Sequence, residues 1–140
     1  MTLWKPSKMR ILVTTARAPA ALELARHLHR AGHEILLADS RVFSIARYSR
    51  YSRKYFRVCP PRESAEQYRH DLCDIIRRES VDLLIPVFEE TLHIAAGIEQ
   101  FRELTQVFCD DIGKRLDGLV YGAIDCRAFV KRDFNRRQRG

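Results

Sequence analysis

The chain has 140 residues, of which 46% are hydrophobic and 31% charged, and its formal net charge at pH 7 is +7. This length and composition are typical of one globular domain with its own hydrophobic core, and they exclude a chain that is disordered throughout. No uncharged apolar stretch approaches the roughly 20 residues that a membrane-spanning helix needs. Arg17 interrupts the apolar run that starts at Ile11, so this run does not form a secretory signal.

Four cysteines occur in the chain, and none of them belongs to a Cys-x-x-Cys pair: Cys59, Cys73, Cys109 and Cys126. Their spacing fits neither a zinc site nor a small disulfide framework, so we expect no metal site. We expect Cys73 and Cys109 to be small core residues. Reduced cysteines and the lack of a signal sequence predict a cytoplasmic protein.

The positive charge is concentrated in two regions of the sequence. Residues 41–57 contain six basic side chains and no acidic one, and residues 114–140 contain eight basic side chains and three acidic ones. The excess in these two regions is larger than the net charge of the whole chain, so the remainder is net negative. The basicity is therefore regional and does not extend over the body of the domain.

In chain order, the first elements are predicted strands on either side of a helix. The apolar, β-branched run over residues 9–15 predicts a buried strand, and residues 33–40 predict a second one. Between them, apolar side chains at helical spacing predict a helix over residues 18–31. Pro19 suits the first turn of this helix, and Gly32 suits the position just after its end.

The middle of the chain begins with an irregular stretch over residues 41–57. Residues 55–58 predict a short third strand, which a pair of prolines closes. Ser64 then stands where a helix N-cap is expected, with Gln67 as its capping-box partner. This helix is predicted to end near Glu79.

Residues 81–87 predict a further strand, residues 90–101 a helix and residues 106–109 a short last strand. The predicted strands are apolar throughout and do not alternate, which is typical of a parallel sheet covered on both faces. We therefore predict an α/β fold with a doubly wound parallel sheet of four to five strands and helices on both faces.

Ligands of a doubly wound sheet bind at the carboxyl ends of its strands, so the loops there supply the candidate site residues. The first of these loops, residues 14–19, contains no glycine and therefore lacks the dinucleotide-binding fingerprint; the chain also has no P-loop motif. Thr15 and Arg17 are candidates for binding an anion at the helix N-terminus. The simpler interpretation is that Thr15 caps the helix and Arg17 is solvated.

Candidate residues also follow two other predicted strands. Asp39 and Ser40 end the second strand, where a ribose-binding acid is often found, although aspartate also commonly begins a turn. Glu89 and Glu90 follow the fourth strand, and adjacent carboxylates can orient a cation or a substrate amine. Alternatively, they are acids that the dipole of the following helix favours.

Residues 47–55 repeat tyrosine, serine and arginine with a period of three. Arginines between tyrosines can bind nucleic acid through phosphate contacts and base stacking, and they can also bind the phosphates of a nucleotide. Alternatively, the tyrosines pack on the domain and the arginines lie in water. Nucleic acid is therefore a possible but less favoured partner.

Three segments resemble a known family when they are taken together and in order. They are RILVTTARAPAALELARHLHRAGHEILLADS from Arg10 to Ser40, SRYSRKYFRVCPP from Ser49 to Pro61, and VDLLIPVFEE from Val81 to Glu90. They resemble the N-terminal, Rossmann-like pre-ATP-grasp domain of ATP-grasp ligases related to the large subunit of carbamoyl phosphate synthase. The resemblance covers about residues 9–110.

Proteins of this family use ATP and magnesium to convert a carboxylate into an acyl phosphate, and an amine or other nucleophile then displaces the phosphate. The resemblance implies that this domain frames a small-molecule carboxylate substrate and carries no catalytic residue. It also implies that later domains hold ATP and magnesium, so that this chain alone binds neither. The residues expected to frame the substrate or nucleotide are Thr15, Arg17, Asp39, Ser40, Glu89 and Glu90.

The resemblance assigns residues 1–111 to the pre-ATP-grasp domain and leaves residues 112–140 as an atypical, basic and partly disordered extension. The family would continue there into a lysine-bearing helix and the ATP-binding domains. One hypothesis is a truncated or frameshifted gene, which an out-of-frame grasp domain in the downstream genomic sequence would support. The expected partner is then a missing ATP-grasp domain or a second copy of this chain.

Two other functions compete with the ligase domain. One is a stand-alone module that binds a nucleotide or nucleic acid through the basic loop and tail. The other is a reductase or epimerase with a degenerate nucleotide loop, which the missing glycines disfavour.

Overall fold

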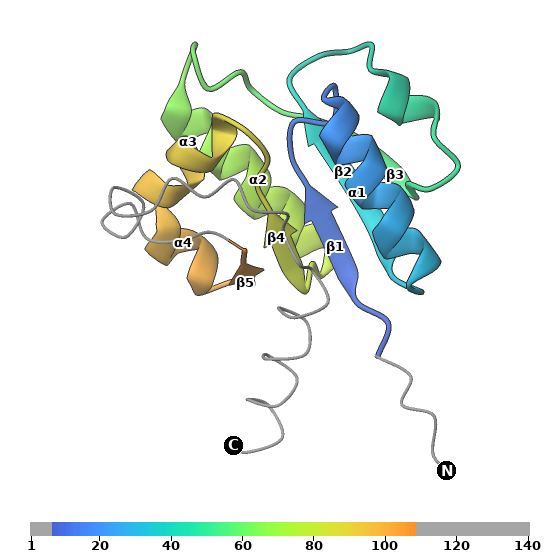
Figure 1. Cartoon of the computed structure of the whole chain (residues 1–140). Helices are drawn as coiled ribbons and strands as arrows, with labels where there is room; N and C mark the ends of the chain where they lie inside the picture. The colour runs from blue at the N-terminus through green and yellow to red at the C-terminus, as the bar shows by residue number, and fades with distance from the viewer. Residues whose placement is uncertain (1–6, 109–140) are drawn as a thin grey trace, which may run out of the picture.

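A computed structural model describes residues 7–108, apart from the side chain of Ile45, and Figure 1 shows their arrangement. One parallel sheet with the strand order β3-β2-β1-β4-β5 forms the centre of these residues. This is the order of the first five strands of the Rossmann fold, so the predicted α/β fold is confirmed. The strands are β1 (Arg10–Val13), β2 (Glu34–Asp39), β3 (Lys54–Arg57), β4 (Leu83–Ile85) and β5 (Gln106–Val107).

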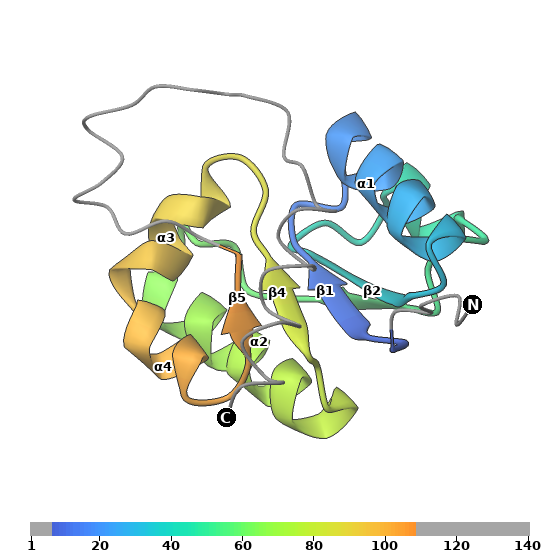
Figure 2. The ribbon, with the colours of Figure 1, turned by 60° about the horizontal axis from the view of Figure 1, so that its bottom comes forward.

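Helices cover both faces of the sheet, as Figure 2 shows. Helix α1 (Pro19–Arg30) packs on one face, and α2 (Ala65–Glu79), α3 (Glu90–Ala96) and α4 (Ile98–Arg102) pack on the other. Successive side chains of the central strand β1 point to opposite faces, as the pleat requires. Ile11 and Val13 join the core on the α1 face, and Leu12 joins the core on the α2 face. The strand is therefore buried on both sides, which explains its continuous apolar sequence.

Helix α1 begins and ends as its sequence predicts. Pro19 occupies the first turn, where the missing N–H leaves no hydrogen bond unmade. At the other end Gly32 has a φ of +96°, and its N–H donates to the carbonyl of His29. The N–H of His33 donates to the carbonyl of Leu28, which completes a Schellman motif.

Helix α2 has the predicted N-cap but only half of the predicted capping box. The Ser64 hydroxyl accepts a hydrogen bond from the backbone N–H of Gln67 at 3.1 Å. The Gln67 side chain does not reach back to Ser64, because it donates to Asp71 one turn further along the helix. The helix ends at Glu79, as predicted, and Ser80 follows it in the left-handed conformation with a φ of 52°.

The structure differs from the predicted elements on the β4 side of the sheet. Strand β4 is shorter than residues 81–87, because Pro86 has no N–H to continue the ladder. The predicted helix over residues 90–101 is divided at Gly97, which has a non-helical backbone (φ −120°, ψ 31°). A Cβ at this position would lie 2.6 Å from the Cδ atom of Arg69, so the absence of a side chain at Gly97 leaves room for Arg69.

Cys73 is buried in the core beneath α2, as expected, and this burial raises the pKa of its thiol. Cys109, Cys126 and the predicted extension over residues 112–140 lie outside the described residues. Among the helices that the structure describes, none combines the length and apolar character needed to cross a membrane.

Candidate functional site

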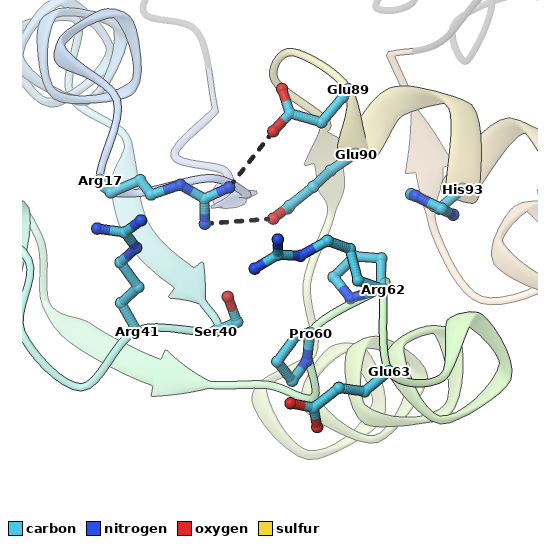
Figure 3. A pocket seen from close by; sticks show the side chains of 10 residues that line it. Arg17, Ser40, Arg41, Pro60, Arg62, Glu63, Glu89, Glu90 and His93 are labelled. Atoms are coloured by element: carbon cyan, nitrogen blue, oxygen red, sulfur yellow. Dashed lines mark hydrogen bonds and ion pairs between the residues drawn. The ribbon is translucent and has the colours of Figure 1, made fainter.

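The loops that follow β1, β2 and β4 meet at the carboxyl edge of the sheet, where Arg17 lies among three carboxylates. Figure 3 shows two of these carboxylates, those of Glu89 and Glu90. Arg17 follows β1, and Asp39 is the last residue of β2. Glu89 immediately precedes α3, and Glu90 is the first residue of that helix. The strand order reverses between β1 and β4, and ligands of this fold bind at such a switch point. Four of the predicted site residues therefore share one site, although the sequence placed them on three separate loops.

Asp39 is fully buried and holds Arg17 in place. Its Oδ2 atom accepts from the backbone N–H of Arg17 at 2.7 Å, and its Oδ1 atom accepts from the Arg17 guanidinium at 2.7 Å. The backbone N–H of Ser40 also donates to Oδ1, at 2.7 Å. A buried carboxylate needs such paired donors. Asp39 therefore positions Arg17 and the β2 loop, and its predicted role in ribose binding stays a prediction.

Arg17 is not the solvated side chain of the simpler interpretation. Besides its contacts with Asp39, its guanidinium lies 3.5 Å from Oε1 of Glu89 and 4.0 Å from Oε1 of Glu90. The Glu89 side chain is 70% exposed, whereas that of Glu90 is 2% exposed. The two adjacent glutamates are thus in different environments, and the buried one needs a partner other than water.

Only one of the two carboxylate oxygens of Glu90 accepts a hydrogen bond. Its Oε2 atom accepts a hydrogen bond of 2.7 Å from the hydroxyl of Tyr68, a buried residue of α2. No donor in the described part of the chain forms a hydrogen bond with the buried Oε1 atom. Burial raises the pKa of Glu90, and burial together with the nearby Glu90 charge raises the pKa of Tyr68. The Thr15 hydroxyl and the Arg17 guanidinium lie close enough to favour the charged form of this carboxyl, but neither makes a hydrogen bond of normal geometry to Oε1. Glu90 therefore keeps a hydrogen-bonding position that a ligand could fill.

Thr15 does not cap α1, so the predicted cap is wrong. The N-cap residue is Ala18, and the Thr15 hydroxyl donates instead to the carbonyl of Val87 at 2.8 Å. The neighbouring Thr14 hydroxyl accepts from the Val87 N–H at 3.1 Å. These two hydrogen bonds connect the loop after β1 to the loop after β4, because both threonine side chains bond to the backbone of Val87.

Backbone strain is also present at this edge. The backbone of Thr15 has a φ of 54° and that of Phe88 a φ of 56°. Residues with a β-branched or bulky side chain rarely adopt this left-handed region. Such conformations cost about 1–3 kcal/mol each and occur most often near functional sites. The strained residues lie in the two loops that carry Arg17 and Glu90.

The arginine and the glutamates lie at one side of a hollow of about 780 Å³. Its lining carries charges of both signs, which suits a small ligand that has both an amine and a carboxylate. The lining residues are Arg17, Ser40, Arg41, Pro60, Pro61, Arg62, Glu63, Glu89, Glu90 and His93.

The sequence analysis missed Arg62 and Tyr68 as members of this site. Arg62 follows Pro60 and Pro61 just beyond β3, so applying the strand-end rule to the third strand would have found it. Tyr68 lies on the apolar face of α2, where a polar hydroxyl needs a buried partner. That need was a signal, but nothing in the sequence showed that the partner is Glu90.

Three glutamates and three arginines line the hollow, so their formal charges balance. The loop after β1 has no glycine that would let the backbone approach a phosphate group closely. Among residues 7–108, no three histidine, cysteine, aspartate or glutamate side chains are placed so that they could hold a metal ion.

The sequence matches no protein-family model and no curated protein. Among solved structures, glycinamide-RNase-transformylase T from Mycobacterium tuberculosis is similar over 70% of this chain, with 23% identity and a TM-score of 0.53. This chain spans 28% of the transformylase chain. The dTDP-glucose 4,6-dehydratase from Bacillus anthracis, solved with NAD, is similar over 71% of this chain and 36% of its own, with 14% identity and a TM-score of 0.47. The likeness to the transformylase supports the Rossmann-like fold.

Proposed function

We propose that this chain is the N-terminal, substrate-framing domain of an ATP-grasp carboxylate–amine ligase and does not complete a reaction by itself. The order of the family-like segments over residues 9–110 supports this proposal. The fold likeness to the transformylase, an ATP-grasp protein, agrees with it. Because the chain corresponds to 28% of that protein, the ligation itself would need further domains.

The observation that carries the proposal is the unfilled Oε1 atom of Glu90 beside Arg17. A substrate ammonium group would donate to this oxygen and supply the missing hydrogen bond. Arg41 and Arg62 also line the hollow, form no ion pair with a described carboxylate and are available to a substrate carboxylate (Figure 3). The site would thus frame a small molecule that carries both groups.

We further propose that ATP and magnesium bind to other domains of such a ligase. The glycine-free β1 loop supports this division, because it lacks the residues that let a backbone approach the phosphates of a nucleotide. The residues of this chain would then hold and orient the amine-bearing substrate, and the other domains would supply the phosphoryl group.

Calorimetric titration of the full chain with a panel of amino acids and amino-acid amides tests the proposal. We expect at least one of them to bind saturably, and E90Q to weaken it by about 10- to 100-fold, because a charge-assisted hydrogen bond is lost. R78Q is a suitable control, since Arg78 is an exposed arginine of α2 outside the hollow. Saturable binding of ATP-magnesium, or no binding of any amine by the folded chain, would contradict the proposal.

A further inference from the structure

The connection between β2 and β3 carries the densest basic and aromatic sequence of the described chain. We call residues 41–57 the tyrosine–arginine loop; it includes the short 3-10 helix Ile45–Tyr48 and strand β3. Because β2 and β3 are parallel, residues 41–53 run from the carboxyl edge of the sheet back to its amino edge, and β3 then returns to the carboxyl edge (Figure 1). Ala46 anchors the loop in the core on the α1 face.

Most of the charge on this loop has no acidic partner in the protein. Of its six cations, Arg53 pairs with Glu34 and Lys54 pairs with Glu79. No carboxylate among the described residues forms an ion pair with the other four, which are Arg41, Arg47, Arg50 and Arg57. These guanidinium groups are therefore available to an anionic ligand.

The guanidinium groups of two of these arginines lie close to tyrosine rings. The Arg47 guanidinium lies 5.9 Å from the ring centres of both Tyr48 and Tyr55, and that of Arg50 lies 5.2 Å from the ring centre of Tyr51. Tyr48 is 74% exposed and buries little of its ring in the core. Alternating rings and guanidinium groups form the kind of surface on which unpaired bases stack and phosphates pair.

A second hollow, of about 270 Å³, lies beside Tyr51 at the amino edge of the sheet. His33 lines it and is 5% exposed. Its Nδ1 atom accepts from the N–H of Met9 at 3.2 Å, so the ring proton is on Nε2. Burial lowers the pKa of His33, and the ring is therefore a neutral hydrogen-bond donor.

Glu34 lines this second hollow, but its negative charge does not make the net charge of the hollow negative. Glu34 lies 3.5 Å from the ammonium of Lys8 and 3.2 Å from the guanidinium of Arg10, and it also pairs with Arg53. One carboxylate thus faces three cations. The hollow remains positive overall and offers donors to a phosphate group.

We infer that the tyrosine–arginine loop and the hollow beside Tyr51 form a binding surface for single-stranded nucleic acid. The exposed ring of Tyr48 requires a base that is free to stack, which a duplex does not offer along this surface. Glu89 and Glu90 lie at the carboxyl edge of the sheet, so these two acids are separated from the Tyr51 end of the loop. The inference does not depend on the proposed ligase function.

Fluorescence anisotropy of the full chain with a labelled RNA of about 12 uridines, at several salt concentrations, tests the inference. The double variant R47Q/R50Q removes two phosphate contacts. We expect it to reduce the slope of log affinity against log salt by about 1.4 and to weaken binding about tenfold or more. The matched control R77Q/R78Q removes the same charge from α2 on the other face of the sheet, and we expect its affinity to stay within about twofold.

The variant Y48A tests for base stacking. We expect it to weaken RNA binding by about 5- to 100-fold and to leave the binding of inorganic polyphosphate unchanged, because polyphosphate has no bases. Circular dichroism confirms the fold of each variant. No RNA binding, equal losses in R47Q/R50Q and R77Q/R78Q, or unchanged RNA binding by Y48A would each overturn the inference.

Discussion

At the scale of single residues, the pair of Asp39 and Arg17 determines the geometry of the carboxyl edge. Asp39 is fully buried and accepts three hydrogen bonds of 2.7 Å from Arg17 and Ser40. We expect D39A to lower the free energy of unfolding by about 3 kcal/mol, because it leaves Arg17 without its buried partner. Urea denaturation measures this change.

Glu89 provides the control for this prediction. Its side chain is 70% exposed and lies 3.5 Å from Arg17, so water screens the pair. We expect E89Q to change the free energy of unfolding by less than about 1 kcal/mol. A similar loss in D39A and E89Q would show that burial does not distinguish the two carboxylates.

A second prediction at this scale concerns the effect of Glu90 on the pH dependence of stability. Burial raises the pKa of Glu90 in the folded chain. Its contribution to stability is therefore complete below the ordinary glutamate pKa of about 4.3 and is lost as the pH rises through the raised value. We expect E90Q to become more stable than the wild type as the pH rises through this range, by about 1.4 kcal/mol for each unit by which the pKa is raised.

Denaturation of both proteins over a series of pH values checks this prediction. E90Q keeps an oxygen that can accept from Tyr68, so the comparison mainly removes the buried charge. A stability difference that does not change with pH would show that Glu90 titrates normally in the folded chain.

At the scale of elements, the two ends of α2 have opposite effects on stability. Ser64 caps the first turn, and we expect S64A to lower the free energy of unfolding by about 1 kcal/mol. Ser80 ends the helix with a φ of 52°, a conformation that glycine adopts without strain. We therefore expect S80G to raise the free energy of unfolding by about 1 kcal/mol. Thermal and urea denaturation measure both, and a loss of stability in S80G would contradict the role of strain.

At the scale of the whole molecule, the two hydrophobic cores share one sheet. Leu28 of α1 belongs to one core and Leu72 of α2 to the other, and both are buried. We expect L28A and L72A each to lower the free energy of unfolding by about 2–5 kcal/mol and each to leave a single cooperative transition. Far-UV and near-UV circular dichroism should then follow the same curve. Separate transitions would show that the two faces unfold independently.

Local sequence predicted most elements because their signals lie in adjacent residues. Pro19, Gly32 and Ser64 are at the helix ends where the sequence placed them. The prediction of one helix over residues 90–101 was wrong at Gly97, whose backbone is non-helical and which packs closely against Arg69 of another helix.

The site was only partly predictable for the same reason. The strand-end rule found Arg17, Asp39, Glu89 and Glu90, because it needs only the order of the strands along the chain. It did not show that Asp39 binds Arg17 or that Tyr68 binds Glu90. These contacts join segments that are far apart in the sequence.

The sequence by itself therefore determined the order of strands and helices, the Ser64 cap and the Gly32 helix end, and the residues at the strand ends, since these depend on neighbouring side chains and backbone propensity. The tertiary structure alone decided which loops meet, which of the two glutamates is buried and which arginines have no acidic partner. Burial, pKa and charge pairing depend on the distances between atoms of distant segments. Packing around the sheet sets those distances.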